Sequence, residues 1–196
     1  MQNDSRKLSD TEIVRQVLDG YVNAFESLLV RYKDLVLKIV KKHVPYHDVE
    51  ETTQEVFVRV YQSLLTFKGK SGFGRWLSSI AVRTCYDYWR KAYRSREVPI
   101  SSLTEKHQDW LEKVISDEPE QSLYEKGFQN EARELLDWAL RNLSAEDRMI
   151  IELMYLEGLS GKEAADLLGW SIANVKVRSF RSRKKLQKLL TRLMEE

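Results

Sequence analysis

Residues 159–186 read LSGKEAADLLGWSIANVKVRSFRSRKKL, and this stretch decides the fold of the second half of the chain. Ser160 and Glu163 have the spacing of a capping box, which satisfies the free backbone N–H groups where a helix begins. Gly169 can supply a tight turn, and Ser171 can cap a second helix. Two helices joined by a short glycine-containing turn are typical of the helix-turn-helix, which places its second helix in the major groove of DNA. We therefore predict that this segment binds duplex DNA through the helix that follows Gly169.

The second helix of this motif has chemically different faces. Its inward side is predicted to consist of Ile172, Val175, Ser179, Ser182, Leu186 and Leu190. On another face, Lys176 and Arg181 can donate hydrogen bonds to guanine O6 and N7, while Val177 and Phe180 can contact thymine methyl groups. The side chains better placed for phosphates are Arg178, Arg183, Lys184 and Lys185. The alternative is a basic, solvated helix that only packs on its neighbours.

Helical periodicity continues through most of the remaining sequence, so we predict an all-α fold class. The three prolines, at 45, 99 and 119, lie between the periodic stretches, and the sequence shows no strand-like alternation and no internal repeat. Helices are predicted from a cap at Ser9 or Asp10 to Gly20, from 24 to Pro45, from 48 to 67, from 72 into the low 90s, over 132–143, and from a cap at Ser144 to Gly158.

The distribution of charge divides the chain, although lysine and arginine outnumber aspartate and glutamate by only 32 to 30. Residues 176–194 carry eight cations and no acid, whereas residues 97–125 carry eight acids and two lysines. We therefore predict two small helical domains, 1–94 and 130–196, joined by an acidic linker over 95–129. The second domain contains the helix-turn-helix.

Composition excludes several classes of protein. Cys85 is the only cysteine, so the chain has no intramolecular disulfide and no cluster of thiolates for zinc. No apolar run reaches the ~18 to 20 residues needed to cross a bilayer, and the first residues are polar rather than signal-like. We expect a soluble, cytoplasmic protein without direct membrane insertion.

Residues 73–91 read FGRWLSSIAVRTCYDYWRK and combine aromatic with basic side chains. Arg83, Tyr86, Arg90 and Tyr93 follow one another at steps of three, four and three residues, which places them on one face of a helix. Such a face can neutralise phosphates and stack on unpaired bases, at ~1 to 3 kcal/mol per base. Alternatively, the rings belong to the core and only the cationic ends reach water. The first interpretation predicts binding to single-stranded DNA, and the two halves together would open a duplex.

The chain resembles, over nearly its whole length, the bacterial extracytoplasmic-function sigma factors, the promoter-recognition subunits of RNA polymerase. Residues 48–57, DVEETTQEVF, resemble the family's D-x-E-D-x-x-Q-E-x-F helix, which docks on the clamp coiled coil of the largest polymerase subunit. Residues 67–91 resemble the stretch that captures the melted minus-ten element. Residues 143–186 resemble the minus-thirty-five domain, with NVKVR at 174–178 in place of T-V-K-S-R.

The resemblance implies three sets of functional residues. Polymerase would be bound by Asp48, Glu51, Gln54, Glu55 and Arg59. The melted minus-ten strand would contact Phe67, Lys68, Lys70, Ser71, Phe73, Trp76, Arg83, Tyr86, Arg90 and Tyr93, and the loop over 68–72, flanked by Phe67 and Phe73, would receive a flipped base. The duplex minus-thirty-five element would contact Ser171, Asn174, Lys176, Val177, Arg178, Phe180, Arg181, Arg183 and Lys184.

The implied partners are core RNA polymerase, at its clamp coiled coil and flap, promoter DNA in duplex and melted form, and an anti-sigma factor; no cofactor is implied. Asn174, Val177 and Ala164 depart from the family's usual threonine, serine and isoleucine, so the minus-thirty-five sequence cannot be copied from a relative. Thr52 also replaces a common aliphatic residue. The acidic linker could occupy a positively charged polymerase channel or only keep the chain soluble, and its patch over 110–115 could contact polymerase or a regulator.

Two other classes of function compete with this interpretation. A repressor or activator that never joins polymerase explains the helix-turn-helix but leaves residues 48–57 and the stacking face without a role. An enzyme would need a metal site at His43, His47, Asp48, Glu51 and Glu55. Pro45 breaks the helix that would align those ligands, and the sequence has no phosphate loop and no serine or cysteine triad. We therefore predict a protein that is not an enzyme and that directs promoter-specific initiation of transcription.

Overall fold

The computed structural model describes residues 8–69, 71–94 and 136–195, and no strand occurs among them. The prediction of an all-α fold is thereby confirmed. The chain divides into two compact units, one made mainly of the helices up to Tyr88 and the other mainly of the helices after residue 135. The predicted linker over 95–129, including its patch over 110–115, lies outside the described residues, and the exact domain boundaries stay predictions.

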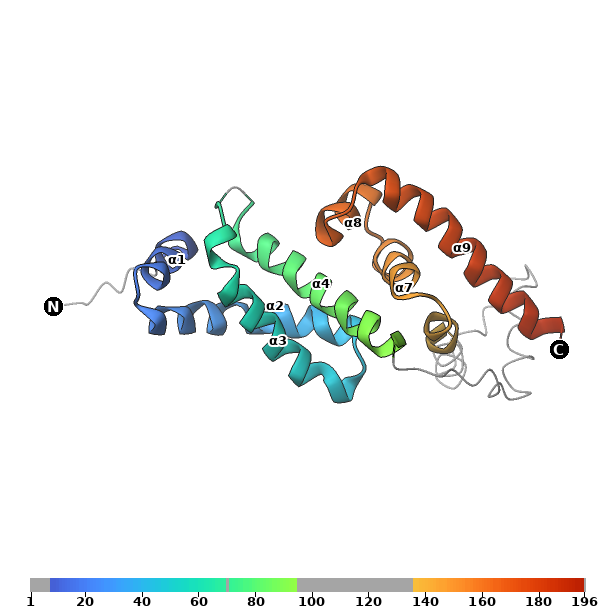
Figure 1. Ribbon diagram of the computed structural model, residues 1–196, viewed down its shortest axis with the longest axis horizontal. Helices are drawn as coiled ribbons and strands as arrows, with labels where there is room; N and C mark the ends of the chain where they lie inside the picture. Colours follow the sequence, from blue (N-terminus) through green and yellow to red (C-terminus); the bar gives the residue numbers. More distant parts are fainter. Residues whose placement is uncertain (1–7, 70, 95–135, 196) are drawn as a thin grey trace, which may run out of the picture. The chain divides into compact units, whose positions relative to one another are not determined.

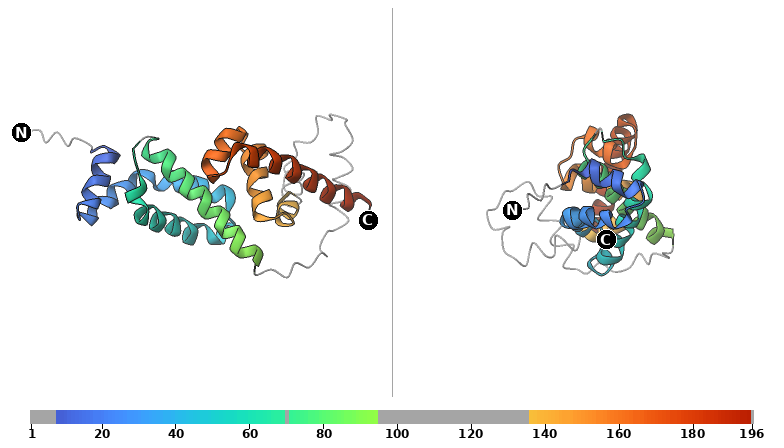
Figure 2. Two further views of the ribbon diagram at one scale, coloured as in Figure 1. Left: turned by 45° about the horizontal axis from the view of Figure 1, so that its top comes forward. Right: turned by 90° about the vertical axis from the view of Figure 1, so that its left-hand side faces the viewer.

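Four helices joined by short 3-10 turns make up the N-terminal unit. They are α1 (Asp10–Leu18), α2 (Phe25–His43), α3 (Val49–Gln62) and α4 (Phe73–Arg94), with turns at Val22–Ala24, Tyr46–Asp48 and Leu64–Thr66. The helices α2 and α3 lie side by side (Figures 1 and 2). Fully buried side chains from α2, α3 and α4, among them Val36, Val56 and Leu77, form one core. This core positions the outward faces of α2, α3 and α4.

Capping residues set the start of α1, as the sequence predicted. The Ser9 hydroxyl accepts the Glu12 N–H at 3.3 Å, and the Glu12 carboxylate accepts the Ser9 N–H at 2.8 Å, which completes a capping box. Tyr32 of α2 donates a hydrogen bond to Asp10 at 2.6 Å, and Arg31 also pairs with Asp10. The first residue of α1 is therefore anchored to α2.

The third helix ends five residues earlier than predicted. It stops at Gln62, and a 3-10 turn over Leu64–Thr66 follows instead of further α-helix. The Thr66 hydroxyl donates to the Ser63 carbonyl at 2.7 Å, a local bond that competes with helical pairing. Leu64 is nevertheless buried, so the apolar periodicity continued while the backbone tightened.

The C-terminal unit begins with a helical segment over 136–141, the described part of the helix predicted over 132–143. Three named helices follow: α7 (Ala145–Ile151), α8 (Gly161–Leu168) and α9 (Ile172–Glu195). Ser144 caps α7 by accepting the Asp147 N–H at 3.3 Å, as predicted. The buried residues Met149, Ile150 and Val175 belong to its core, and the described residues of this unit place α9 against α7.

The helix after Ser144 does not stay α-helical up to Gly158. Residues Glu152–Leu156 form a π-helical turn, in which the Glu157 N–H donates to the Glu152 carbonyl, five residues back, at 2.9 Å. Such a turn inserts one extra residue into a helix, and these insertions occur often at functional sites. The apolar spacing alone could not distinguish this turn from continued α-helix.

Candidate nucleic-acid and protein interfaces

The local geometry of residues 160–174 is that of a helix-turn-helix. The Ser160 hydroxyl accepts the Glu163 N–H at 3.3 Å, and the Glu163 carboxylate accepts the Ser160 N–H at 2.9 Å, so the predicted capping box at the start of α8 is present. Gly169 has a φ of +72°, a conformation that residues with a side chain rarely adopt. Ser171 then caps α9 by accepting the Asn174 N–H at 3.2 Å. The glycine turn and both caps are as predicted.

The solvent-facing side of α9 mixes cations with apolar side chains. Val177 is 52% exposed and Phe180 53% exposed, and the ammonium of Lys184 lies 4.7 Å from the centre of the Phe180 ring. The other exposed members of the predicted duplex-binding set are Ser171, Asn174, Lys176, Arg181 and Arg183. A helix face that combines hydrogen-bond donors with exposed apolar groups suits the edges of base pairs in a major groove.

The buried side of α9 follows the prediction from Val175 to Leu186, which is half-buried against the core of the C-terminal unit. Val175, Ser179 and Ser182 are buried. Ile172 was predicted to face inward but is 45% exposed, because it is the first residue of α9 and lies at the edge of the packed surface. The side chain of Leu190 lies outside the described residues.

Arg178 differs from the rest of the predicted duplex-binding set. It is only half-buried, and its Nη1 lies 3.5 Å from an oxygen of the buried Asp147. Lys185, also predicted to contact phosphate, donates to the other oxygen of Asp147 at 2.5 Å. The two cations on this edge of α9 are therefore already paired with an acid of α7.

The predicted single-strand face of α4 is unevenly exposed. Arg83 and Arg90 are exposed, whereas Tyr86 and Tyr93 are half-buried. The cationic part of the predicted pattern is thus at the surface. The rings combine partial burial with partial access, so their packing in the structure is compatible with either interpretation, and contact with single-stranded DNA stays a prediction.

An aromatic cluster supports the loop before α4. Ring centres of Phe67 and Phe73 are 5.2 Å apart, and the Trp76 ring lies 5.3 Å from each. Phe73 is only 2% exposed, because its ring fills the core, so it flanks the loop from below and leaves little ring surface for the predicted contact with the melted strand. Phe67 and Trp76 are half-buried and keep an accessible edge.

The loop itself presents polar and basic groups. Lys68 and Ser71 are exposed, and Gly69 and Gly72 have φ values of +73° and +72°. Lys70 lies outside the described residues. The two glycines allow a tight loop, which favours close approach of a nucleic-acid backbone or base.

The predicted polymerase-binding residues lie on two different faces at the start of and along α3. Tyr88 of α4 donates to Asp48 at 2.6 Å, and Arg59 donates to Asp87 of α4 at 2.7 Å and to Glu55 at 2.6 Å. Burial alone would lower the pKa of Arg59, but the hydrogen bonds to Asp87 and Glu55 raise it. Asp48 and Arg59 therefore join α3 to α4.

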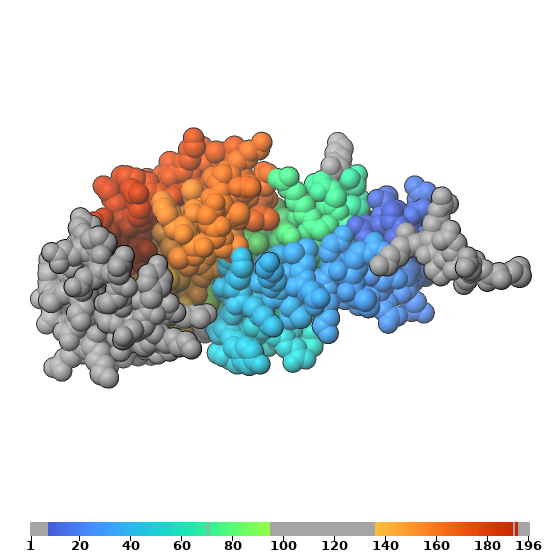
Figure 3. Space-filling view, turned by 180° about the vertical axis from the view of Figure 1, so that it is seen from behind, coloured from blue at the N-terminus to red at the C-terminus, as the bar shows by residue number. Residues whose placement is uncertain are grey.

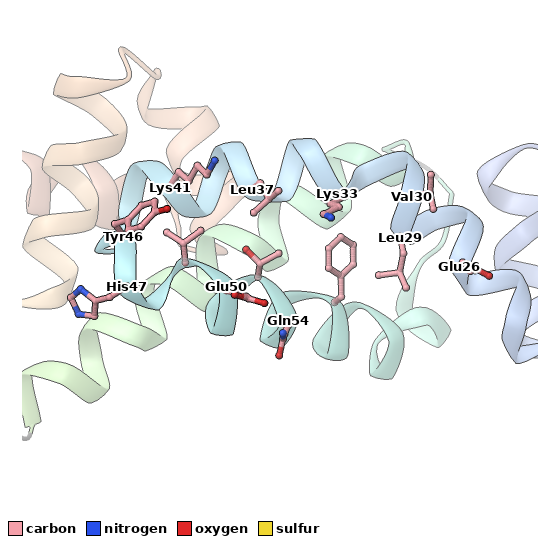
Figure 4. Close-up of a pocket in the computed structure, with 13 residues that line it drawn as sticks. Glu26, Leu29, Val30, Lys33, Leu37, Lys41, Tyr46, His47, Glu50 and Gln54 are labelled. Atoms are coloured by element: carbon pink, nitrogen blue, oxygen red, sulfur yellow. The ribbon is translucent and has the colours of Figure 1, made fainter.

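The remaining predicted polymerase-binding residues, Glu51 and Gln54, are exposed on α3. Gln54 lines a groove of about 780 Å³ between α2 and α3, which Figure 4 shows with Lys33 and Leu37 on α2 and Glu50 and Gln54 on α3. The outer surface of α2 spreads across one face of the N-terminal unit (Figure 3). The complete lining is Glu26, Leu29, Val30, Lys33, Leu37, Lys41, Tyr46, His47, Val49, Glu50, Thr53, Gln54 and Phe57.

Sequence reasoning missed the α2 side of this groove. It predicted a helix from 24 to Pro45 and gave Leu29, Val30 and Leu37 no functional role. Val30 is 74% exposed, whereas Leu29 and Leu37 are half-buried at the edge of the core. The available signal was that apolar residues of α2 cover more of the helix circumference than one core stripe needs. An apolar face of that width indicates a second partner surface.

The rejected metal site has no counterpart in the described parts of the chain, where no group of three or more histidine, cysteine or acidic side chains could hold an ion. His43 is buried at the end of α2, and His47 is exposed beside Asp48. Among the helices of the described ranges, none is both long and apolar enough to cross a membrane.

Known proteins match both halves of the chain. Residues 28–95 match the family model of sigma-70 region 2, and residues 133–186 match sigma-70 region 4. The chain is 33% identical over 197 residues to the ECF RNA polymerase sigma-E factor of Escherichia coli, covering 96% of this chain and 100% of that protein. It is 28% identical over 192 residues to the ECF RNA polymerase sigma-E factor of Haemophilus influenzae, with 97% and 100% covered.

Among solved structures, the chain is similar to CnrH, which was solved in complex with the cytosolic domain of CnrY. The identity is 25%, the TM-score is 0.52, and the match covers 93% of this chain and 97% of CnrH. The all-α fold, the match to region 2 followed by the match to region 4, and the relatives that align over nearly the whole chain all indicate the same family. The chain belongs to the family of extracytoplasmic-function (ECF) sigma factors of RNA polymerase.

Proposed function

We propose that this protein joins core RNA polymerase and directs initiation at promoters, with α9 on the minus-thirty-five element and α4 on the melted minus-ten element. The observation that carries this proposal is the exposed face of α9, where Val177 and Phe180 lie in solvent among cations. Water does not solvate apolar side chains favourably, so those exposed on a basic helix can be stabilised by packing on thymine methyl groups in the major groove. The protein would be a non-enzymatic initiation factor, because polymerase supplies the nucleotide chemistry.

The minus-ten role rests on α4 and the loop before it. Arg83 and Arg90 can neutralise phosphates, and the accessible edges of Tyr86 and Tyr93 can stack on unpaired bases. We assign the flipped base to the loop formed by Lys68, Gly69 and Ser71, with Phe67 and Trp76 beneath it. Phe73 supports that loop from the core and makes no DNA contact in this proposal.

Polymerase binding is assigned to the groove between α2 and α3 and to the exposed side of α3. Glu51 and Gln54 provide polar contacts, and Leu29, Val30 and Leu37 provide apolar ones. Apolar anchors surrounded by polar groups are typical of protein interfaces. The clamp coiled coil of the largest subunit is the proposed occupant, and the flap is the proposed partner of the C-terminal unit.

Control by an anti-sigma factor is part of the proposal. Membership of the ECF family supports it, and the exposed groove and the basic face of α9 are surfaces that an inhibitor would need to cover. Because its targets are polymerase and the chromosome, we place the protein in the cytoplasm. Purification of the protein from resting cells should recover a bound inhibitor in stoichiometric amount; recovery of the chain alone would count against this control.

Reconstituted transcription tests the central claim. Core polymerase with this protein should initiate at defined promoters in genomic DNA, and sequencing of transcript 5′ ends should give shared upstream elements. Core polymerase alone is the control. A chain that binds DNA but neither binds core polymerase nor starts transcripts would be a repressor or activator, and the proposal would be wrong.

A further inference from the structure

A buried acid of α7 lies directly beneath α9. Asp147 is 1% exposed, and its carboxylate receives groups from three residues of α9. The Ser182 hydroxyl donates to Oδ1 at 2.7 Å, and the Lys185 ammonium donates to Oδ2 at 2.5 Å. The guanidinium of Arg178 lies 3.5 Å from Oδ1. Both carboxylate oxygens are thus committed to α9.

The electrostatics keep this acid ionised. Burial alone would raise the pKa of Asp147, but the hydrogen bonds from Lys185 and Ser182 hold that pKa below its ordinary value. Charge-assisted hydrogen bonds are directional as well as strong. The acid therefore fixes the angular position of Ser182 and Lys185 around the axis of α9 relative to α7.

In the first three turns of α9, apolar packing alone would hold this angle weakly. The fully buried residues of α9 in its first three turns are Val175, Ser179 and Ser182, whose small side chains offer few interlocking groups, and the larger Leu186 and Leu189 pack on the core only further along the helix. A second polar link, between Ser179 and Tyr155 at 2.9 Å, lies on the same side of α9. With a side-chain radius of about 5 to 6 Å, a helix rotation of about 20° would displace each reading side chain by about 2 Å. That displacement is enough to break a base contact.

The same acid also affects the charge available to DNA. Arg178 and Lys185 lie on one edge of α9, between the buried side and the exposed face with Val177 and Arg181. Because both are paired with a buried carboxylate, they are held back from phosphates that any DNA sequence would offer. The sequence-independent affinity for phosphates along that edge of α9 is thereby reduced.

We propose that Asp147 is a positioning residue for promoter recognition, which sets the rotation of α9 and restrains Arg178 and Lys185 so that binding depends on base contacts. This inference rests on the proposed role of α9 in reading duplex DNA. Asp147 itself is buried and touches no DNA. Its loss should therefore reduce discrimination between sequences rather than simply reduce affinity.

The test uses the full-length protein and duplexes selected by the wild type from a random pool. Asp147→Asn keeps the shape of the side chain but removes the charge that holds Lys185 and Arg178. We expect weaker binding to the selected duplex and tighter binding to a scrambled one, so that their affinity ratio falls at least tenfold. On the scrambled duplex, the slope of log affinity against log salt should steepen by about 1 to 2, since each added phosphate contact contributes about 0.9.

Asp137→Asn is the matched control, because Asp137 is an exposed acid of the same unit and its replacement changes the net charge equally. It should leave both the ratio and the salt slope at wild-type values. Ser182→Ala removes one hydrogen bond without removing charge, and it should lower the ratio a few-fold with an unchanged slope. If Asp147→Asn fails to fold by circular dichroism, Ser182→Ala decides the question.

Failure of the positioning role and failure of the proposed function would give different results. Wild-type preference and salt slope in Asp147→Asn, or wild-type preference in Ser182→Ala when the first variant does not fold, would overturn the positioning role. A wild-type protein that selects no sequence from the pool would instead overturn the proposed function of α9.

Discussion

In the proposed function, single side chains on α9 divide between those that contact base edges and those that contact phosphates. Arg181 lies on the exposed face with Val177 and Phe180, so Arg181→Ala should weaken binding to the minus-thirty-five duplex by about 1 to 3 kcal/mol and relax preference at one base pair. Titration against single-base-pair variants of the duplex measures both effects. Arg183→Ala is the control, because its predicted phosphate contact should be lost equally on every sequence. An equally uniform loss for Arg181→Ala would show that Arg181 contacts only phosphate.

Tyr32 gives a pH-dependent contribution to stability. Burial, followed by its hydrogen bond to Asp10, raises the pKa of Tyr32 from 10.0 to about 12. A raised pKa means that the folded state favours the protonated phenol, so this contribution is complete below pH 10 and is lost as pH rises through about 12. Tyr32→Phe should therefore lower the free energy of unfolding by about 1 kcal/mol near neutral pH, and this advantage of the wild type should decline as the pH rises from 10 towards 12. Denaturant unfolding of both proteins across this range measures it, and equal stability at neutral pH would contradict it.

For single residues, the sequence could predict the chemical role of a side chain better than whether that side chain points into the core or into solvent. The caps at Ser9, Ser144, Ser160 and Ser171 were predictable because each depends on neighbours within three residues. Phe67 and Phe73 were not distinguishable, because both are aromatic and flank the same loop, and only the packed core shows which one is buried. The α4 partners of Asp48 and Arg59 are far away in sequence, so the role of those two residues in joining helices could not be foreseen.

The helix α4 is expected to act after the first encounter with a promoter. Replacing Arg90 and Tyr93 by alanine should slow promoter opening more than it weakens the closed complex, because stacking needs bases that are already unpaired. Stopped-flow fluorescence of a base analogue in the minus-ten element, beside affinity measurements on intact duplex, separates the two steps. Unchanged opening kinetics would refute the stacking assignment.

The groove between α2 and α3 makes a prediction about polymerase. Val30 is 74% exposed on its rim, so Val30→Asp should leave folding intact and weaken binding to core polymerase about tenfold or more, roughly 1.4 kcal/mol. Leu65→Asp is a matched control, since Leu65 is 82% exposed and does not line the groove. Competition binding with a labelled sigma factor gives both affinities. Similar losses in the two variants would show that the groove has no special role.

At the scale of elements, the presence of each helix was predictable, whereas the positions of the helix ends were less so. Apolar periodicity located the helices of the first half, and capping residues with the glycine turn located α8 and α9, because these signals depend on local sequence. The early end of α3 and the π turn over Glu152–Leu156 escaped them, because both keep the same buried stripe while the backbone pairing changes. The groove was missed for a related reason, since a second apolar face looks like a wider core stripe.

The whole molecule should require two promoter elements at a fixed separation. If one unit holds the minus-ten element and the other the minus-thirty-five element, inserting about five base pairs between them turns one element half a helical turn away from the other. Transcription should then fall to the level of core polymerase alone, whereas single-base-pair changes should reduce it gradually. Reconstituted transcription from promoters with spacers of different lengths measures this. Equal output from every spacer length would contradict simultaneous binding to both elements.

The exposed Val177 and Phe180 on α9 have a further consequence for the genome that this protein serves. Thymine carries its methyl group at C5, on the major-groove edge of the base pair. A methyltransferase that modifies cytosine at C5 adds the same group at an equivalent place. A promoter read by contact with methyl groups would therefore respond to cytosine methylation, and the cell's modification pattern could change which promoters this protein selects without any change in base sequence.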